Sequence, residues 1–199
     1  MHISEGVLSP AILGLGAVLS TGGVALGLRR LDAERLITVA LLGAAFFVAS
    51  LIHVPIGPTS AHLIMNGLLG TILGWAAFPA ILIALTLQAV LFQYGGITVL
   101  GVNTLTMSLP AVLCFYLWRP LLLRIDFWRA VGAFCCGAFS VAGSALLTAA
   151  ALAFSEQGFV SAAQMLVLAH VPVMVVEGLI TTLVVGFLSK VRPELLQWS

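Results

Sequence analysis

Residues 162–189 read AAQMLVLAHVPVMVVEGLITTLVVGFLS, a run in which Glu177 is the single charged side chain. A helix needs about 20 apolar residues to cross the hydrocarbon core of a bilayer, so this run predicts a membrane-spanning helix. The whole chain has the same character, since 61% of its 199 residues are hydrophobic and 8% are charged. Soluble domains carry about 25% charged residues. The composition therefore excludes a soluble enzyme or a nucleic-acid-binding protein and predicts an all-α, polytopic membrane protein.

Six further apolar stretches have the length of spanning helices, which makes about seven in all. Short loops between them leave no room for a soluble domain, so residues 1–199 are expected to form a single transmembrane domain. A tight turn is expected near Phe78-Pro79, and residues 95–103 are expected as a loop or a short re-entrant piece. The expected spans are residues 7–28, 36–54, 62–78, 80–94, 104–118, 129–154 and 162–189.

The basic residues predict the orientation, because Lys and Arg near helix ends stay on the cytoplasmic side. Seven spans with the N-terminus outside and the C-terminus in the cytoplasm place all eight Lys and Arg inside. Any other orientation of the same spans places all of them outside. The basic residues form three groups: Arg29, Arg30 and Arg35; Arg119, Arg124 and Arg129; Lys190 and Arg192.

Four histidines stand out in this apolar chain, because polar groups within a membrane protein are functional candidates by default. In the predicted topology His2, His53 and His62 map to the outer face, and His170 lies about one third of the way into the last span from that side. Neutral imidazole suits Ni, Co, Cu and Zn. Several imidazoles on one side therefore indicate a site for a divalent transition metal.

The start of the chain offers a chelating group. It lacks a basic region like that of a signal peptide, and a bulky residue at position 2 blocks removal of Met1, so the amine of Met1 is expected to be free. That amine and the backbone amide of His2 close a five-membered ring on a metal, and the amide and imidazole of His2 close a six-membered ring. These three donors lie near one plane, and one further nitrogen completes a square.

Several motifs then resemble one family over nearly the whole chain. The opening Met1-His2-Ile3-Ser4-Glu5-Gly6 is similar to the start of the cobalt and nickel substrate-binding membrane subunits, the CbiM/NikM family, of energy-coupling-factor (ECF) transporters. The further matching segments, in order, are Val54-Pro55, Gly57 to Leu63 and Asn66-Gly67; Leu91-Phe92-Gln93, Gly95-Gly96 and Leu100 to Asn103; His170-Val171-Pro172 and Glu177-Gly178.

The resemblance implies a metal site near the outer face in residues 1–6 and the loop that opens the third span. Its ligands would be the amine of Met1, the amide and imidazole of His2, and a histidine that maps to His62. Some family members carry a longer loop with Ser-Cys-Ser-His at this point, where this sequence has Thr59-Ser60-Ala61-His62. This departure leaves His53 as the alternative ligand. The transported substrate would be Ni(II) or Co(II), and the sequence does not choose between them.

Other polar residues have open roles in the sequence. Asn103, Thr59 and Ser60 either bind near the metal or cap local structure. His170 is favoured as a supporting residue over a direct ligand, because Pro172 frees a backbone carbonyl for a side-chain partner. Glu177 is a buried partner for another helix, a protonated packing residue or part of a subunit contact, whereas Gln88 and Gln93 are expected to form interhelical hydrogen bonds.

The chain has no GxxxxGK[ST] loop for binding ATP, so ATP would act only through partner subunits. The resemblance implies a membrane coupling subunit like EcfT, CbiQ or NikQ, a pair of cytoplasmic ATPases like CbiO or NikO, and in some systems a small membrane subunit like CbiN or NikN. It also implies the cytoplasmic membrane of a bacterium or archaeon. The alternative functions are a passive or secondary metal transporter, an intramembrane metalloenzyme and a vitamin-binding subunit.

Overall fold

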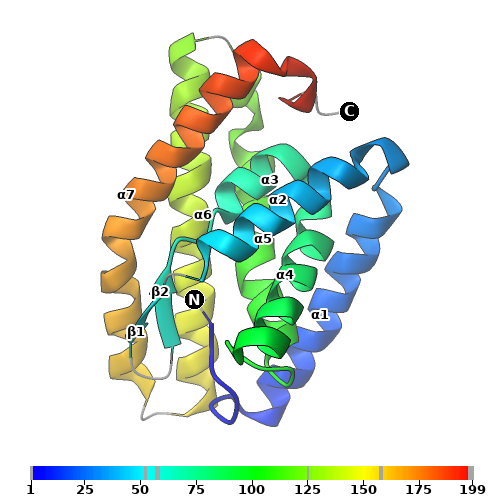
Figure 1. Ribbon diagram of the computed structural model, residues 1–199. Helices are drawn as coiled ribbons and strands as arrows, with labels where there is room; N and C mark the ends of the chain where they lie inside the picture. Colours follow the sequence, from blue (N-terminus) through cyan, green and yellow to red (C-terminus); the bar gives the residue numbers. More distant parts are fainter. Residues whose placement is uncertain (1, 52, 57–58, 125, 157–158, 197–199) are drawn as a thin grey trace.

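The computed structural model describes residues 2–51, 53–56, 59–124, 126–156 and 159–196, and these residues form an almost wholly helical bundle (Figure 1). A two-stranded antiparallel hairpin, β1 (His53–Ile56) and β2 (Thr59–His62), interrupts the helices. The all-α prediction is therefore confirmed apart from this hairpin. The helices are α1 (Pro10–Arg29), α2 (Leu36–Ala49), α3 (Asn66–Leu73), α4 (Ala77–Phe92), α5 (Leu100–Leu122), α6 (Asp126–Ser155) and α7 (Val160–Val191), with 3₁₀ turns at Ala33–Arg35, Gly74–Ala76 and Pro193–Leu196.

Two of the expected spans are shorter as helices than the sequence predicts. Helix α2 has 14 residues and α3 has 8, in place of the expected 36–54 and 62–78. The hairpin continues both helices toward the lower end of the bundle in Figure 1, so each expected span is part helix and part strand. If the helix continued, a proline at position 55 would remove a helical hydrogen bond and clash with the preceding turn. This explains why the apolar stretch leaves the helical conformation.

The turn predicted near Phe78-Pro79 lies earlier, at Gly74. Gly74 has φ 54° and ψ −123°, a backbone conformation that a residue with a Cβ rarely adopts. Helix α3 rises to this point and α4 returns from it (Figure 1). Pro79 instead lies in the first turn of α4, where its missing N–H costs no helical hydrogen bond.

Five segments in the described part of the chain are long and apolar enough to cross a membrane. The second of them, Asn66–Phe92, contains the reversal at Gly74, so it is a helical pair and not one straight helix. The five segments are Pro10–Arg29, Asn66–Phe92, Leu100–Leu122, Phe127–Ser155 and Val160–Val191.

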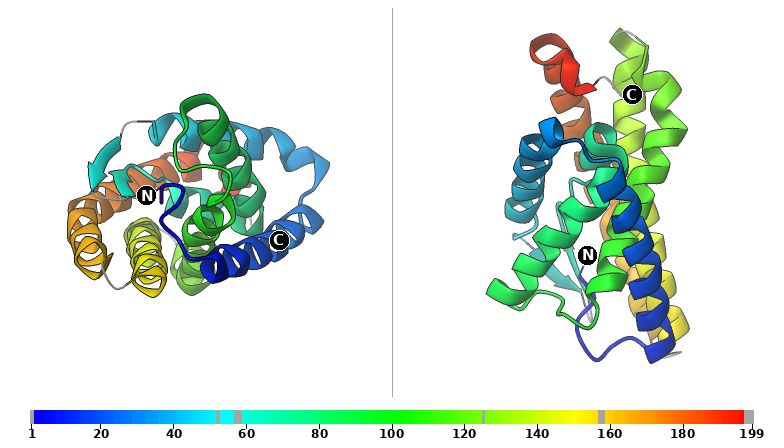
Figure 2. Two further views of the ribbon diagram at one scale, coloured as in Figure 1. Left: turned by 90° about the horizontal axis from the view of Figure 1, so that it is seen from below. Right: turned by 90° about the vertical axis from the view of Figure 1, so that its right-hand side faces the viewer.

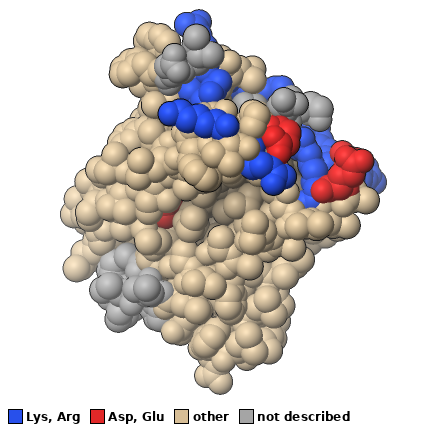
Figure 3. Space-filling model, turned by 45° about the horizontal axis from the view of Figure 1, so that its top comes forward, with Lys and Arg blue, Asp and Glu red and all other residues tan. Residues whose placement is uncertain are grey.

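Figure 3 shows Lys and Arg side chains gathered toward one end of the bundle, which we call the charged end. The eight Lys and Arg lie in or beside the α1–α2 connection, in or beside the α5–α6 connection, and at the end of α7. The N-terminal segment, the hairpin and the loop between α4 and α5 lie toward the opposite end, as the view from below shows (Figure 2, left). The two ends of the bundle therefore differ sharply in charge, as the grouping of basic residues predicts.

Helix α3 lies in the centre of the bundle, and glycines allow its close approach to α5 and α6. All eight of its residues are buried. A Cβ on Gly70 would lie 2.4 Å from the carbonyl oxygen of Ala111, and one on Gly67 would lie 2.5 Å from Cα of Gly137. Small residues at such contacts let helix backbones pack closely in lipid.

We therefore expect Gly70→Ala to destabilise the protein, because the added methyl group forces α3 away from α5. Overpacking of this kind costs about 1–3 kcal/mol. The measurement is the thermal melting temperature of the purified protein in detergent. Gly22→Ala is the matched control, since a Cβ on this helical glycine meets nothing within 4 Å, and it should leave the melting temperature unchanged or raised. Equal melting of the Gly70→Ala variant and the wild type would contradict this packing.

Candidate metal centre

The N-terminal segment enters the bundle as an extended chain that α5 holds by one side chain. The backbone N–H of Ile3 donates to Asn103 Oδ1 at 3.0 Å, and Asn103 Nδ2 donates to the carbonyl of Ile3 at 3.2 Å. One amide side chain thus pairs with both backbone groups of Ile3, as a neighbouring strand would. The side chain of Ile3 is fully buried. These contacts fix how far Ile3 enters the bundle and how it is aligned with Asn103 of α5.

Asn103 lies in the first turn of α5, and the prediction that it belongs to a loop is wrong. Its backbone N–H donates to the carbonyl of Val99 at 2.9 Å, the i to i−4 bond of an α-helix. The helix begins at Leu100, so the re-entrant piece expected over residues 95–103 is reduced to a short loop followed by a helix.

The loop before α5 also contacts the N-terminal segment. Glu5 Oε1 accepts hydrogen bonds from the backbone N–H of Thr98 at 3.0 Å and from its hydroxyl at 3.2 Å. The backbone bond from Thr98 lowers the pKa of the Glu5 carboxyl, so the bond favours the charged form. Gly96 has φ +133°, and a Cβ there would overlap the side chain of Glu5. Position 96 therefore requires a glycine, because the loop before α5 contacts Glu5 of the N-terminal segment there.

His2 lies between α4 and the hairpin and is only 6% exposed. Its Nε2 lies 2.7 Å from Oε1 of Gln88, a fully buried residue of α4. Its ring centroid lies 4.8 Å from that of His62, with the two planes tilted by 35°. Two histidines that are 60 positions apart in the sequence therefore lie side by side in the interior.

His62 ends β2 and is 4% exposed. Its Nδ1 lies 2.8 Å from the carbonyl oxygen of Leu63. A carbonyl only accepts hydrogen bonds, so Nδ1 carries the proton and Nε2 keeps its lone pair. With its proton on Nδ1, the neutral ring can offer Nε2 to a metal.

Glu177 of α7 anchors the chain directly after His62. Its Oε1 accepts hydrogen bonds from the backbone N–H groups of Ile64 and Met65, the latter at 2.7 Å. Met65 has φ 53°, a left-handed conformation that costs energy for a residue with a long side chain. The carboxylate thus holds the sharp bend between β2 and α3. Of the roles that the sequence leaves open for Glu177, the observed bonds come nearest to a buried partner on another helix, but the groups that it binds are backbone N–H groups in the segment between β2 and α3.

The structure describes the surroundings of only some of the other predicted site residues. His170 is fully buried in α7, and its Nδ1 donates to the carbonyl of Leu166 at 2.7 Å within the same helix. The backbone of His53 pairs with that of His62 in the hairpin. Met1 and the side chains of His53, Thr59 and Ser60 lie outside the described residues. Among the side chains that are described, no group of three or more His, Cys, Asp or Glu gathers at one point.

Gln88 is the site residue whose role is least evident from the sequence. Its Nε2 donates to the carbonyl of Phe47 at 3.1 Å and to Ser50 Oγ. The interhelical hydrogen bond predicted for Gln88 is therefore confirmed, and its partner helix is α2. Its contact with His2 is not predicted. The sequence shows one amide side chain in an apolar helix. This indicates that the side chain has a polar partner, but it does not indicate which residue the partner is.

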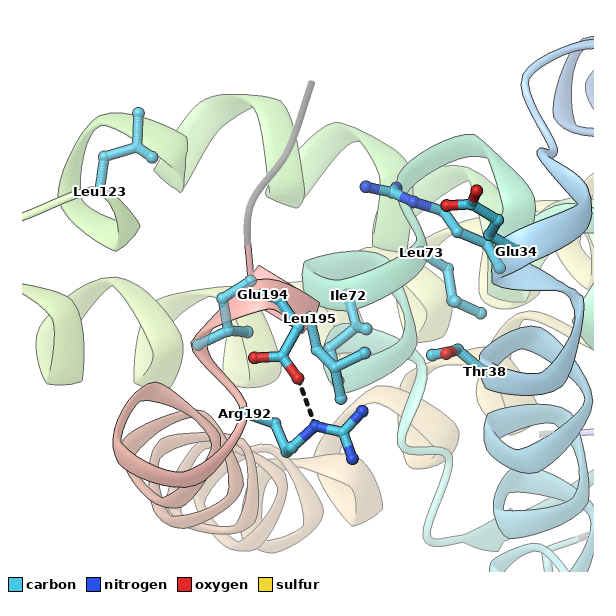
Figure 4. A pocket seen from close by; sticks show the side chains of 10 residues that line it. Glu34, Thr38, Ile72, Leu73, Leu123, Arg192, Glu194 and Leu195 are labelled. Atoms are coloured by element: carbon cyan, nitrogen blue, oxygen red, sulfur yellow. Dashed lines mark hydrogen bonds and ion pairs between the residues drawn. The ribbon is translucent and has the colours of Figure 1, made fainter.

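A separate hollow of about 840 Å³ lies at the charged end (Figure 4), and no histidine lines it. Residues from α2, α3 and the C-terminal 3₁₀ turn line it, and Arg192 and Glu194 form an ion pair at its edge. Both side chains of that pair are more than half exposed, so it contributes little to stability.

Comparison with known proteins places the chain among metal transport proteins. The family model CbiM, described as cobalt uptake substrate-specific transmembrane region, matches residues 2–195. A putative metal transport protein of Haemophilus influenzae is 45% identical over 202 residues, which cover 98% of this chain and 97% of that protein. A putative fused nickel transport protein NikMN of Archaeoglobus fulgidus is 31% identical and is matched over 99% of this chain and 68% of its own length.

A solved structure shows the same architecture. The crystal structure of a truncated transition metal transporter aligns with a TM-score of 0.84 at 28% identity, over 96% of this chain and 99% of that one. Another relative, from Methanocorpusculum labreanum, is named as a putative fused cobalt transport protein CbiMQ. The relatives are named for metal transport and not for an enzymatic reaction. The chain belongs to the CbiM family, the substrate-specific transmembrane region of cobalt uptake.

Proposed function

We propose that this protein captures Ni(II) or Co(II) at the extracytoplasmic face as the substrate-binding component of an ATP-driven ECF importer. The observation that carries the proposal is the pair of buried histidines, His2 and His62, whose rings lie 4.8 Å apart beside the start of the chain. In a chain with four histidines, their meeting next to a chelating N-terminus favours a site for a transported metal ion.

The proposed ligands are four nitrogens. The amine of Met1 and the amide and imidazole of His2 form two fused chelate rings, and His62 supplies Nε2. The hydrogen bond from His62 Nδ1 to Leu63 supports this choice, because it leaves Nε2 as the nitrogen with a lone pair. Asn103 and Gln88 hold the segment and the ring of His2 in place. A planar set of four nitrogens suits Ni(II), and relatives named for nickel and for cobalt both occur.

The proposed topology has seven passes through the membrane. Helices α1, α4, α5, α6 and α7 each supply one pass, and α2 with β1 and β2 with α3 supply two more. The hairpin backbone is compatible with a position at membrane depth, because irregular backbone is tolerated where protein surrounds it. Basic residues favour the cytoplasmic side, which assigns the charged end to the cytoplasm and the histidine pair to the outside of the cytoplasmic membrane.

The proposed partners are a membrane coupling subunit like CbiQ or NikQ, a cytoplasmic ATPase pair like CbiO or NikO, and a small membrane subunit like CbiN or NikN. The relatives named NikMN and CbiMQ are fusions, which supports a direct association of such parts. ATP hydrolysis in the partners would reorient the loaded subunit. Return of protons to the amide and imidazole nitrogens would then weaken the metal site on the inner side.

A blocked N-terminal amine should abolish high-affinity Ni(II) binding. An N-terminal extension converts the amine of Met1 into a peptide amide and leaves every side chain in place. The measurement is isothermal titration of Ni(II) into the purified protein, with the N-terminus verified by intact mass. The extension should be one that a protease removes without leaving residues behind, so that binding returns after cleavage. The same extension at the C-terminus is the control, and strong binding by the blocked protein would refute a role for the amine.

Replacement of His62 by Ala should lower Ni(II) affinity by more than about 100-fold, because residues that merely support a ligand already contribute about 10–100-fold. His53→Ala and His170→Ala are the matched variants, and each should bind within a fewfold of the wild type. A larger loss in His53→Ala than in His62→Ala would reassign the fourth nitrogen. The absorption spectrum of the Ni(II) complex provides a second measurement, since it reports whether the planar set of four nitrogens is intact.

A further inference from the structure

We infer that Gln88 is a positioning residue that selects the tautomer of His2, so that His2 presents Nδ1 to the metal. The inference rests on the proposed function and concerns how the metal-free protein prepares its ligand. It is argued from the hydrogen bonds that run from the carbonyl of Phe47 through Gln88 to His2.

The orientation of the Gln88 amide follows from its partners in α2. One end of the amide lies 3.1 Å from the carbonyl oxygen of Phe47. A carbonyl only accepts hydrogen bonds, so this end must be the NH₂ group. The hydroxyl of Ser50 donates to the carbonyl of Phe46 at 2.7 Å and therefore accepts from the same NH₂ group. Both contacts assign the oxygen of Gln88 to the other end, which faces His2.

The tautomer of His2 follows from that orientation. Gln88 Oε1 lies 2.7 Å from His2 Nε2, and an amide oxygen only accepts, so Nε2 must carry the proton. The opposite tautomer would place two acceptors against each other in a site where Gln88 is fully buried and His2 is 6% exposed. Buried polar groups without a partner are costly, and the surroundings therefore disfavour the opposite tautomer.

This tautomer is the one that chelation requires. The path from the His2 backbone nitrogen through Cα, Cβ and Cγ to Nδ1 closes a six-membered ring on a metal. Nε2 lies on the far side of the imidazole and cannot close that ring. The proton on Nε2 thus leaves the chelating nitrogen with its lone pair, and the bond to Gln88 persists when the metal binds. Such outer hydrogen bonds orient a metal-binding imidazole and increase its basicity.

The two histidines are therefore prepared in complementary ways. The carbonyl of Leu63 holds the proton of His62 on Nδ1 and leaves Nε2 for the metal. The oxygen of Gln88 holds the proton of His2 on Nε2 and leaves Nδ1. In each case an acceptor fixed by the backbone or by a neighbouring helix determines which ring nitrogen is available.

The test is ¹⁵N NMR of the metal-free protein labelled at its histidine side chains. The His2 signals are assigned as those that disappear in a His2→Ala variant. Wild-type His2 should show the chemical shifts of a single tautomer protonated at Nε2. Gln88→Leu removes the acceptor and should shift both ring nitrogens toward an average of the two tautomers, with a loss of Ni(II) affinity of about 10–100-fold.

Gln88→Glu separates a positioning role from a merely structural one. Its carboxylate still accepts from Nε2 of His2 but repels the carbonyl of Phe47, so this variant should keep the tautomer and exceed the Ni(II) affinity of Gln88→Leu whatever happens to its melting temperature. Thr86→Val is the control on the same helix, since that hydroxyl bonds only to the carbonyl of Leu82 among the contacts described. It should leave both the tautomer and the affinity unchanged.

Two results would overturn the inference: protonation of wild-type His2 at Nδ1, or Gln88→Leu with unchanged ring shifts and affinity. Failure of the proposed function is a different result, in which the wild type binds no Ni(II). The tautomer measurement needs no metal, so it gives its answer in either case.

Discussion

The pairing of Asn103 with both backbone groups of Ile3 is the constraint on which the site depends. An extended segment that enters an apolar bundle carries N–H and C=O groups that need partners, and within the described part of the chain no strand pairs with residue 3. A single amide side chain in the first turn of α5 takes that role. The ring of His2 can then reach Gln88 and His62 only because residue 3 has a fixed position in the bundle.

The buried polar groups next to His2 are hydrogen-bonded to one another in a short series that begins at a backbone carbonyl. The carbonyl of Phe47 orients Gln88, and Gln88 holds His2. Low polarity around such chains strengthens each bond and makes a missing partner costly. The scarcity of charged residues is thus compatible with a precise site, because amides and imidazoles do the positioning.

Sequence reasoning predicts the parts of the fold that hydropathy and charge control. The long helices and the location of the basic residues at one end follow from such patterns. The pairing of His2 with His62 is instead expected from the resemblance of the sequence motifs to the CbiM/NikM family. The hairpin does not, because an apolar stretch of this length is equally consistent with a buried strand or a helix. The reversal at Gly74 is missed for a related reason, since Phe78-Pro79 is the stronger turn signal and the first turn of a helix accepts proline. The bond between Gln88 and His2 joins residues 86 positions apart and depends on packing that no local pattern encodes.

The hydrogen bonds of Glu177 connect helix α7 mechanically to the bend after His62. The helix has 32 residues and is therefore about 48 Å long at 1.5 Å per residue. It begins near the histidine end, holds the bend after His62 at its midpoint and finishes among the basic residues of the other end. A tilt of α7 imposed at Lys190 would be carried through a rigid element to the strand that bears His62. The helix can thus act as a lever that connects a force applied at one face of the protein to His62 near the other.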